Sequence, residues 1–159
     1  MKLSIAKDVY AFKLDQKLLT AAVYGYKGVS KKDIFIPSEI GKYKVIEVGH
    51  IQYRQKRKYN WFDVEQIILP ESIRTVKLSA FNGCHKLTNI SLPQSIEKIE
   101  MLAFAYCEAL EYVYFPKNTV EIGDAAFLGC RNLKTVVVPE TIRKIGRAAF
   151  PENTEIMFY

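Results

Sequence analysis

Residues Leu87–Cys107, LTNISLPQSIEKIEMLAFAYC, contain every element of a unit that the chain repeats. The proline, phenylalanine, cysteine and first leucine of this unit all recur with a period of 23 residues. The recurring positions are Pro70, Pro93, Pro116 and Pro139; Phe81, Phe104, Phe127 and Phe150; Cys84, Cys107 and Cys130; and Val64, Leu87, Leu110 and Leu133. A fixed period of about 20 to 50 residues is typical of stacked repeat architectures. The sequence therefore predicts a solenoid with regular repeats over residues 67–150.

Each repeat has a short apolar triplet before its proline, as in Ile90-Ser91-Leu92. Successive side chains of a strand point to opposite faces, so the first and third residues should face the core and the second should be exposed. Proline cannot donate to a ladder and ends the strand. Across the coils the exposed residues form a stripe. Its members are Phe35, Ile68, Ser91, Tyr114, Val137 and Met157, with Gln66, Asn89, Tyr112, Thr135 and Glu155 beside them.

The second half of the unit carries another apolar pair and then an Ala-Phe dipeptide, as in Ile96, Ile99 and Ala103-Phe104. We expect a short strand or bridge followed by a single helical turn. The stacked phenylalanines fill the core, each burying on the order of 150–250 Å². The chain has three cysteines, and an odd number argues against a disulfide framework. Equivalent side chains in a stack also point the same way, whereas a disulfide needs its Cβ atoms turned toward each other. The cysteines should form a buried, reduced ladder.

The residues outside the regular repeats complete a single domain of 1–159. Residues 1–30 contain two β-rich segments that flank Asp15-Gln16-Lys17, which is a hairpin signal. A solenoid needs its first coil covered, so this hairpin is the predicted N-terminal cap. The alternative is that its aromatic side chains bind a ligand. Residues 31–66 form an irregular first repeat, in which Ile34-Phe35-Ile36-Pro37 corresponds to Ile90–Pro93, and residues 151–159 provide a C-terminal capping strand.

The first repeat contains a basic and aromatic insertion at residues 54–62. Residues 1–66 hold 13 Lys and Arg against 7 Asp and Glu, whereas residues 67–159 hold 10 of each, so the whole net charge of +6 lies in the front part. Cations beside aromatic rings can contact phosphates and stacked bases, or an acidic protein or membrane surface. The plain alternative is a solvated loop. The candidate residues are Arg54, Lys56, Arg57, Lys58, Tyr59 and Trp61.

The unit Leu-x-x-Ile-x-Leu-Pro-x-x-Ile-x-x-Ile-x-x-x-Ala-Phe-x-x-Cys, complete at Leu87–Cys107, resembles the BspA-like leucine-rich repeat family, also called the Treponema pallidum type. The segment IPSEIGKYKV at residues 36–45 resembles the Ile-Pro-x-x-Ile-x-x-x-x-Val segment that often follows a β-hairpin in that family. The resemblance covers residues 10–159. It implies an α/β repeat solenoid, a right-handed and mostly β coil with short helical turns and a parallel sheet on its concave face. Many members are bacterial surface or secreted proteins proposed to bind host proteins or other cells.

Signals for catalysis are absent from the sequence. The two histidines, His50 and His85, fall in different coils, and the cysteines repeat at 23 residues rather than at metal-ligand spacing. There is no Gly-x-Ser-x-Gly elbow and no P-loop. We therefore expect no enzyme activity, no cofactor and no metal site.

The sequence favours a non-catalytic module that binds a protein through the concave face. An exposed stripe of this composition is more apolar than solubility requires, and such patches often mark interfaces. Simple β-propensity is the plain alternative. The candidate partner-binding residues are Phe35, Ile68, Tyr112, Tyr114, Val137 and Met157. A homo-oligomer through this face, or a structural role as one segment of a longer solenoid, also fits the pattern. Binding of an anionic partner, such as nucleic acid, an acidic protein or a membrane surface, through the basic front part is the alternative function.

The chain shows no apolar run near the roughly 20 residues of a membrane span. Residues Met1–Asp8 lack the apolar region of a signal peptide, so we expect a cytoplasmic protein. A mature fragment of a longer protein would instead be secreted or displayed at the cell surface.

Overall fold

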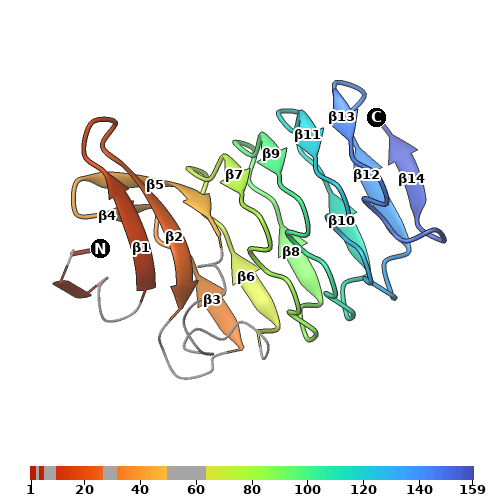
Figure 1. Ribbon diagram of the computed structural model, residues 1–159, viewed down its shortest axis with the longest axis horizontal. Helices are drawn as coiled ribbons and strands as arrows, with labels where there is room; N and C mark the ends of the chain where they lie inside the picture. Colours follow the sequence, from red (N-terminus) through yellow and green to blue (C-terminus); the bar gives the residue numbers. More distant parts are fainter. Residues whose placement is uncertain (3, 6–9, 27–31, 50–63) are drawn as a thin grey trace.

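The chain winds into a β-solenoid in the computed structural model, which describes residues 1–2, 4–5, 10–26, 32–49 and 64–159 (Figure 1). One strand of each coil lies in what we call the triplet row, because its strands contain the triplets that precede the prolines. These strands are β3 (Asp33–Phe35), β6 (Gln66–Ile68), β8 (Asn89–Ser91), β10 (Tyr112–Tyr114), β12 (Thr135–Val138) and β14 (Glu155–Phe158). They pair in parallel as β3-β6-β8 and β10-β12-β14, and β8 lies beside β10.

The second strand of each coil belongs to an 8-stranded sheet, called here the long sheet. Its order is β1-β2-β5-β7-β9-β11-β13, and β4 pairs with β5 outside this path. The strands are β1 (Tyr10–Asp15), β2 (Thr20–Tyr26), β4 (Glu39–Ile40), β5 (Tyr43–Val48), β7 (Thr75–Val76), β9 (Lys98–Ile99), β11 (Glu121–Ile122) and β13 (Lys144–Ile145). The pairs from β2 to β13 along this order are parallel, as stacking of successive coils requires.

The strand register follows the repeat period of the sequence. Ile67 lies beside Ile90, and Val113 lies beside Val136, so equivalent residues of successive coils are neighbours. The irregular first repeat joins the same stack, because Ile34 lies beside Ile67. The expected alignment of the first repeat with the regular ones is therefore confirmed.

The core is a column of aromatic and aliphatic side chains between the two rows of strands. Phe81, Phe104 and Phe127 are fully buried and stack with ring centroids 5.3 and 5.1 Å apart. Phe150 continues the column at 5.4 Å from Phe127, and Phe115 meets the ring of Phe127 edge-on at 5.8 Å. Offset stacks and edge contacts of this kind are favourable beyond their burial alone. The predicted phenylalanine ladder is therefore the centre of the fold.

The expected helical turn in each repeat is wrong. The chain makes successive tight turns at residues 78–86, 101–109 and 124–132. In the four described coils from residue 78 onward, the first turn holds one residue at positive φ. These residues are Ser79, Leu102, Ala125 and Ala148, with φ between 48 and 58°. The N–H groups of Phe104 and Tyr106 donate to the carbonyls of Ala126 and Leu128 in the next coil, at 2.8 and 2.6 Å. These N–H groups are therefore hydrogen-bonded to the next coil and are not available for hydrogen bonds within a helix.

The cysteines form the expected buried ladder. Cys84, Cys107 and Cys130 are all buried and all carry free thiols. The Cys107 thiol donates to the carbonyl of Phe81 at 3.3 Å, and the Cys130 thiol donates to that of Phe104 at 3.1 Å. The hydrogen bond with Cys107, together with burial, raises the pKa of the Cys130 thiol well above its ordinary value. The cysteines are therefore suited to packing rather than to nucleophilic chemistry.

Residues 10–26 form the predicted hairpin, with β1 antiparallel to β2. The hairpin joins the long sheet, since β2 pairs with β5. Tyr10 is buried and its hydroxyl donates to the carbonyl of Phe35, while Phe12 packs against the core. The alternative prediction was that the aromatic side chains of the hairpin bind a ligand. The rings of Tyr10 and Phe12 are turned toward the core instead.

Thr119 lies where the other repeats have isoleucine, at Ile73, Ile96 and Ile142. Its side chain is fully buried, and its hydroxyl makes no hydrogen bond to any described residue. A buried polar group without a partner destabilises the folded state. We expect Thr119→Val to raise the free energy of unfolding by about 1 kcal/mol. Equilibrium denaturation in urea would measure this difference, and a clear loss of stability in the valine variant would contradict the expectation.

Candidate functional site

The triplet row carries a stripe of exposed, mostly apolar side chains. We use the name stripe for the second residues of the triplets: Phe35, Ile68, Ser91, Tyr114, Val137 and Met157. All are exposed except Val137, which is half-buried, whereas their neighbours Ile34, Ile67, Ile90, Val113 and Val136 are buried. Phe35 has 61% of its surface exposed. Parallel strands lie about 4.8 Å apart, so six strands give a stripe roughly 24 Å long.

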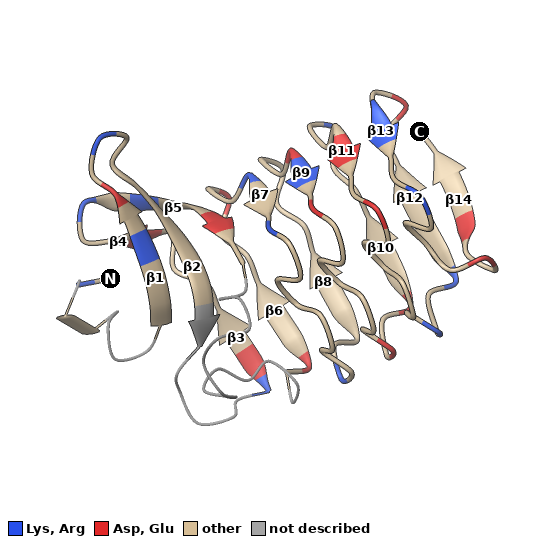
Figure 2. Ribbon diagram, in the orientation of Figure 1, with Lys and Arg blue, Asp and Glu red and all other residues tan. Residues whose placement is uncertain are grey.

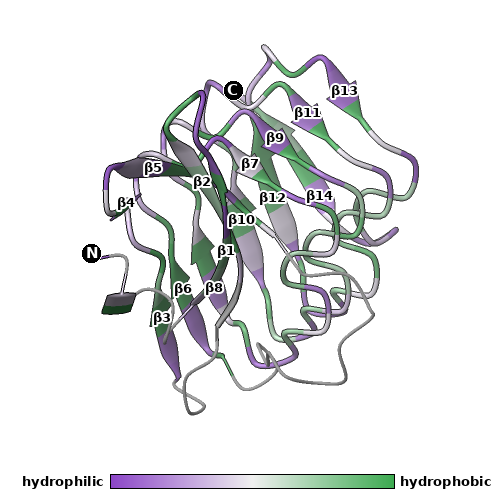
Figure 3. Cartoon of the chain, turned by 60° about the vertical axis from the view of Figure 1, so that its left-hand side comes forward, coloured by the Kyte–Doolittle hydropathy of each residue, from purple (hydrophilic) through white to green (hydrophobic). Residues whose placement is uncertain are grey.

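A second line of side chains runs beside the stripe and is polar. Gln66, Asn89, Tyr112 and Glu155 are exposed, and Thr135 is half-buried. Hydrophobic residues run through β3, β6 and β8, with hydrophilic residues where these strands begin (Figure 3). Among the described residues, charge stands only at the two ends of these lines: Glu155 at the C-terminal end and Asp33, which is exposed and in register with Gln66, at the other. The middle of this face therefore offers rings, aliphatic groups and amides rather than charge.

Three tyrosines gather near the C-terminal end of this face. Tyr112 and Tyr114 lie two residues apart on β10, and the ring of Tyr159 stacks on that of Tyr114 with centroids 5.2 Å apart. The Tyr159 hydroxyl donates to the carbonyl of Phe115 at 3.0 Å. Burial and the hydrogen bond with Tyr114 raise the pKa of Tyr159 to about 12, so the donor stays protonated at neutral pH. Sequence reasoning missed Tyr159. The available signal was its place after the last strand, where other coils have proline.

The charged side chains of the long sheet pair with one another. Glu121 lies between two lysines, with its carboxylate oxygens 2.9 Å from Lys144 Nζ and 3.0 Å from Lys98 Nζ. Hydrogen bonds from Lys144 and Lys98 hold the pKa of Glu121 below its usual range. Lys77 is likewise 2.9 Å from Glu100 and 3.9 Å from Glu47. Blue and red alternate along β9, β11 and β13 (Figure 2). The charges along β9, β11 and β13 are thus balanced by their neighbours.

The structure does not test the predicted basic site. Arg54, Lys56, Arg57, Lys58, Tyr59 and Trp61 lie outside the described residues. Of the described cations in the front part, Lys32 pairs with Glu65 at 3.1 Å and Lys42 lies over the ring of Tyr43 at 5.7 Å. Each contact involves a single lysine, and the two lysines do not form a site for an anion.

A shallow cleft of about 560 Å³ lies between the hairpin and β5. Lys13, Lys17, Tyr24 and Glu47 are among the residues that line it. Its lining mixes both signs of charge, and Asp15 already accepts hydrogen bonds from the N–H groups of Lys17 and Leu18, both at 2.9 Å. The cleft is therefore a weaker candidate for a binding site than the triplet row.

Two further tests concern metals and membranes. Within the described ranges, no cluster of three or more His, Cys, Asp or Glu side chains could hold a metal ion. Among the same residues, no helix has both the length and the apolar character needed to cross a membrane.

Known proteins share this architecture. The structure superposes on the crystal structure of the leucine-rich repeat protein of T. pallidum with a TM-score of 0.82 and 30% sequence identity, over 95% of this chain and 67% of that one. A leucine-rich cell surface protein from Faecalibacterium prausnitzii gives 0.65 and 22%, over 94% of this chain and 49% of that one. A leucine-rich repeat protein from Bacteroides capillosus gives 0.67 and 24%, over 81% and 93%. No curated protein matches the chain.

The stacked coils and parallel strand rows define a leucine-rich repeat solenoid. The sequence profile of the BspA type leucine rich repeat region matches residues 54–158 in six copies. The chain belongs to the BspA-type leucine-rich repeat family. Repeats of this class are generally protein-interaction modules, and the scaffold is typically non-enzymatic. This chain spans about two thirds of the T. pallidum protein and about half of the F. prausnitzii protein.

Proposed function

We propose that this protein is a non-catalytic module that binds a protein partner through the exposed face of the triplet row, which is the concave side of the solenoid. The observation that carries the proposal is the stripe itself. Six coils place one exposed or, at Val137, half-buried residue each in a line, and five of the six residues are apolar or aromatic. Contiguous exposed apolar surface of this kind marks interaction sites.

The composition of the face suits protein recognition. Tyrosine gives a large and rigid contact area at low entropic cost, and serine and asparagine adapt their hydrogen bonds to the partner. Tyr112 and Tyr114 supply the rings, while Asn89 and Ser91 on the neighbouring strand supply amide and hydroxyl groups. The centre of the face carries no charge that a partner would have to neutralise. The partner surface should therefore be mainly apolar and polar rather than charged.

The hairpin completes this scaffold as its N-terminal cap. It pairs with β5 through β2 and is tied to β3 by the hydrogen bond from Tyr10 to Phe35. In this position it covers the backbone edge and the apolar residues of the first coil. The binding face is then held by a stack that is closed at the hairpin end.

Replacement of both Tyr112 and Tyr114 by alanine tests the binding face. If these rings are interface anchors, the affinity for a captured partner should fall by roughly 100-fold, equivalent to about 3 kcal/mol. The partner can be isolated by pull-down with the intact protein, and isothermal titration calorimetry then measures the affinity of each variant.

A matched control is the pair Met101→Ala and Leu128→Ala. These side chains are similarly exposed but lie in the turns, outside the triplet row. The control variant should bind as tightly as the intact protein. Equal affinity of the tyrosine variant and the intact protein would remove the triplet row from consideration. Thermal unfolding of both variants checks that the fold is retained.

The anionic-partner function stays a prediction from the sequence. Its residues at 54–62 lie outside those described, and the charged face of the long sheet is balanced. Binding of this kind would weaken steeply between about 50 and 200 mM salt. Alanine at Arg54, Lys56, Arg57 and Lys58 would abolish it. Binding through the triplet row should show neither effect. A cytoplasmic location likewise remains an expectation.

A further inference from the structure

The cleft between the hairpin and β5 is shaped by two shifts in strand register. The register of β1 with β2 shifts by one residue and passes over Tyr24 on β2. The register of β2 with β5 shifts in the same way and passes over Ile46 on β5. An extra residue of this kind bends its strand and re-aims a side chain, and such irregularities are frequent next to active sites. Both extra residues line the cleft, whose volume of about 560 Å³ lies within the range of ligand pockets, about 300–1,000 Å³.

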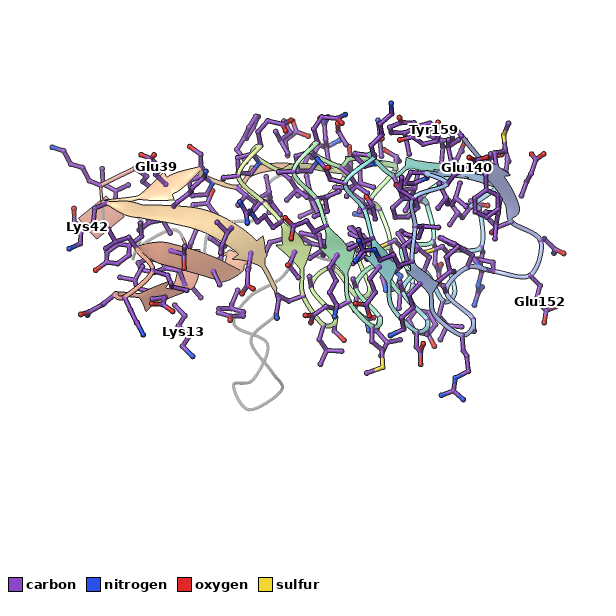
Figure 4. All side chains as sticks on the ribbon, turned by 90° about the horizontal axis from the view of Figure 1, so that it is seen from above. Lys13, Glu39, Lys42, Glu140, Glu152 and Tyr159 are labelled. Carbon is purple, nitrogen blue, oxygen red and sulfur yellow. The ribbon has the colours of Figure 1, made fainter. Side chains whose placement is uncertain are left out.

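Ala22 forms the floor of the cleft between two charged side chains. It is in register with Lys13 on β1 and with Glu47 on β5. The residues that flank Lys13 and Ala22 along their strands pack in or against the core, so Lys13 and Ala22 themselves face outward. Lys13 is exposed and projects away from the sheet (Figure 4). A short methyl group between two longer side chains leaves room for a ligand between their charged ends.

The charges around the cleft balance one another. Lys13 and Lys17 are positive, and Asp15 and Glu47 are negative. Asp15 Oδ1 accepts hydrogen bonds from two N–H groups of the turn between β1 and β2, so this carboxylate holds the turn in place. A lining of this kind suits neither a single ion nor a strongly charged surface. It suits a small ligand that carries both signs of charge.

Two charged groups of the cleft have capacity for such a ligand. Glu47 is 3.9 Å from Lys77, which is too far for a hydrogen bond, and Lys77 makes its short contact of 2.9 Å with Glu100. Lys13 has no ion-pair partner among the described residues. The Glu47 carboxylate and the Lys13 ammonium can therefore both take a partner from solution.

Tyr24 provides a wall of the cleft with a hydroxyl donor. Its ring lies close to Gly49, where an added Cβ atom would come within 3.0 Å of the ring. Burial and the nearby Glu47 carboxylate raise the pKa of Tyr24, so the hydroxyl stays protonated at neutral pH. Thr20 adds a second hydroxyl, and Ile46 adds an aliphatic surface. The cleft thus combines two opposite charges with hydroxyl groups and a small apolar surface.

We propose that this cleft binds a zwitterionic dipeptide with small aliphatic side chains, whose carboxylate contacts Lys13 and whose ammonium group contacts Glu47. A ligand with one charge would meet a group of like sign as well as one of opposite sign, whereas a zwitterion is complementary to both. Two strand spacings place the Cα atoms of Lys13 and Glu47 roughly 10 Å apart. An extended dipeptide spans at most about 7 Å, a gap that the two side chains can bridge.

Titration of the intact protein with L-alanyl-L-alanine, followed by amide chemical shifts in NMR, tests the site. We expect saturable shifts at Ala22, Tyr24 and Glu47, with a dissociation constant on the order of 1 mM or tighter. The N-acetylated dipeptide lacks the ammonium group, and the C-amidated dipeptide lacks the carboxylate. Each should bind about tenfold more weakly, because each leaves one charged group of the cleft without its partner. Free L-alanine, whose two charges are closer together, should also bind more weakly.

Glu47→Gln tests the orientation of the ligand. It removes the negative charge with little change of shape and should weaken binding of the free dipeptide by about tenfold. The variant should also lose the preference for the free dipeptide over its N-acetylated form, because the ammonium group no longer has its partner. Glu97→Gln is the matched control, since Glu97 is 3.8 Å from Arg74 in a similar ion pair and lies outside the cleft. Thermal unfolding by circular dichroism confirms that both variants fold.

The outcomes are decisive in both directions. Saturable binding that requires both charges, with the preference for a free ammonium group lost in Glu47→Gln alone, supports the proposal. The absence of saturable shifts, shifts confined to other parts of the chain, equal binding of the capped and free dipeptides, or an equal loss in Glu97→Gln would overturn it. The result is independent of the partner-binding face, because the variant with alanine at Tyr112 and Tyr114 should bind the dipeptide as the intact protein does.

Discussion

Phe104→Ala should lower the free energy of unfolding by roughly 3–5 kcal/mol. Phe104 lies in the middle of the aromatic column, fully buried, with the rings of Phe81 and Phe127 on either side at 5.3 and 5.1 Å. Removal of its ring deletes both stacks and leaves a cavity that the coils cannot fill, since their spacing is fixed by strand hydrogen bonds. Such a loss is a large part of the total stability of a domain of this size.

Equilibrium denaturation in guanidinium chloride, followed by circular dichroism, measures this loss. Phe35→Ala is the control, because the Phe35 ring is exposed on the stripe. It should change the free energy of unfolding by less than about 1 kcal/mol. A change below about 1 kcal/mol in Phe104→Ala itself would show that the column is not the centre of the core.

Gly123→Ala should be strongly destabilising. A Cβ atom at this position would lie 2.6 Å from the backbone nitrogen of Met101 and 2.7 Å from the carbonyl carbon of Glu100. Both are backbone atoms of the preceding coil, so neither can move aside without a shift of the whole coil. Overpacking of this kind costs about 1–3 kcal/mol and occasionally more.

Gly49→Ala provides the comparison for this substitution. Its Cβ would lie 3.0 Å from the Cβ of Lys77 and from the ring of Tyr24, which is a tight contact but longer than the backbone contacts at Gly123, and the tyrosine ring can rotate away. The melting temperature of Gly123→Ala should therefore fall further than that of Gly49→Ala. Equal shifts in the two variants would contradict the close backbone approach at Gly123.

Much of the fold could be predicted because the same sequence pattern recurs in several coils. Period, proline position and alternation together predicted which residues of the triplets face the core, as the exposure of Ile68 between buried Ile67 and Leu69 illustrates. The hairpin followed from local composition. Each of these features depends on interactions that are short in sequence or repeated identically from coil to coil.

The turns could not be predicted in the same way. Ala103-Phe104 has a composition that suits a helix, and no local signal shows that the backbone will donate to the neighbouring coil instead. The positive φ of Leu102 and Tyr106 is also hidden, since these are residue types that rarely adopt it. In both cases a contact about 22 residues away overrides the local preference.

Only part of the candidate face could be predicted from the sequence. Alternation predicted the exposed residues, but the contribution of Tyr159 depends on where the shortened last repeat brings the chain end. Phe158, as the third residue of a triplet, was expected to face the core, but 56% of its surface is exposed.

Hydrogen bonding between the turns has a consequence for how such a molecule can change over evolution. The N–H groups of one coil always meet the carbonyls of the next, from Phe81 to Ala103, Phe104 to Ala126 and Phe127 to Ala149. A coil inserted by duplication of a whole repeat would find the same donors on one side and the same acceptors on the other. The gene can therefore lengthen or shorten in steps of one repeat without a new interface, and the length of the triplet row becomes a trait that selection can adjust.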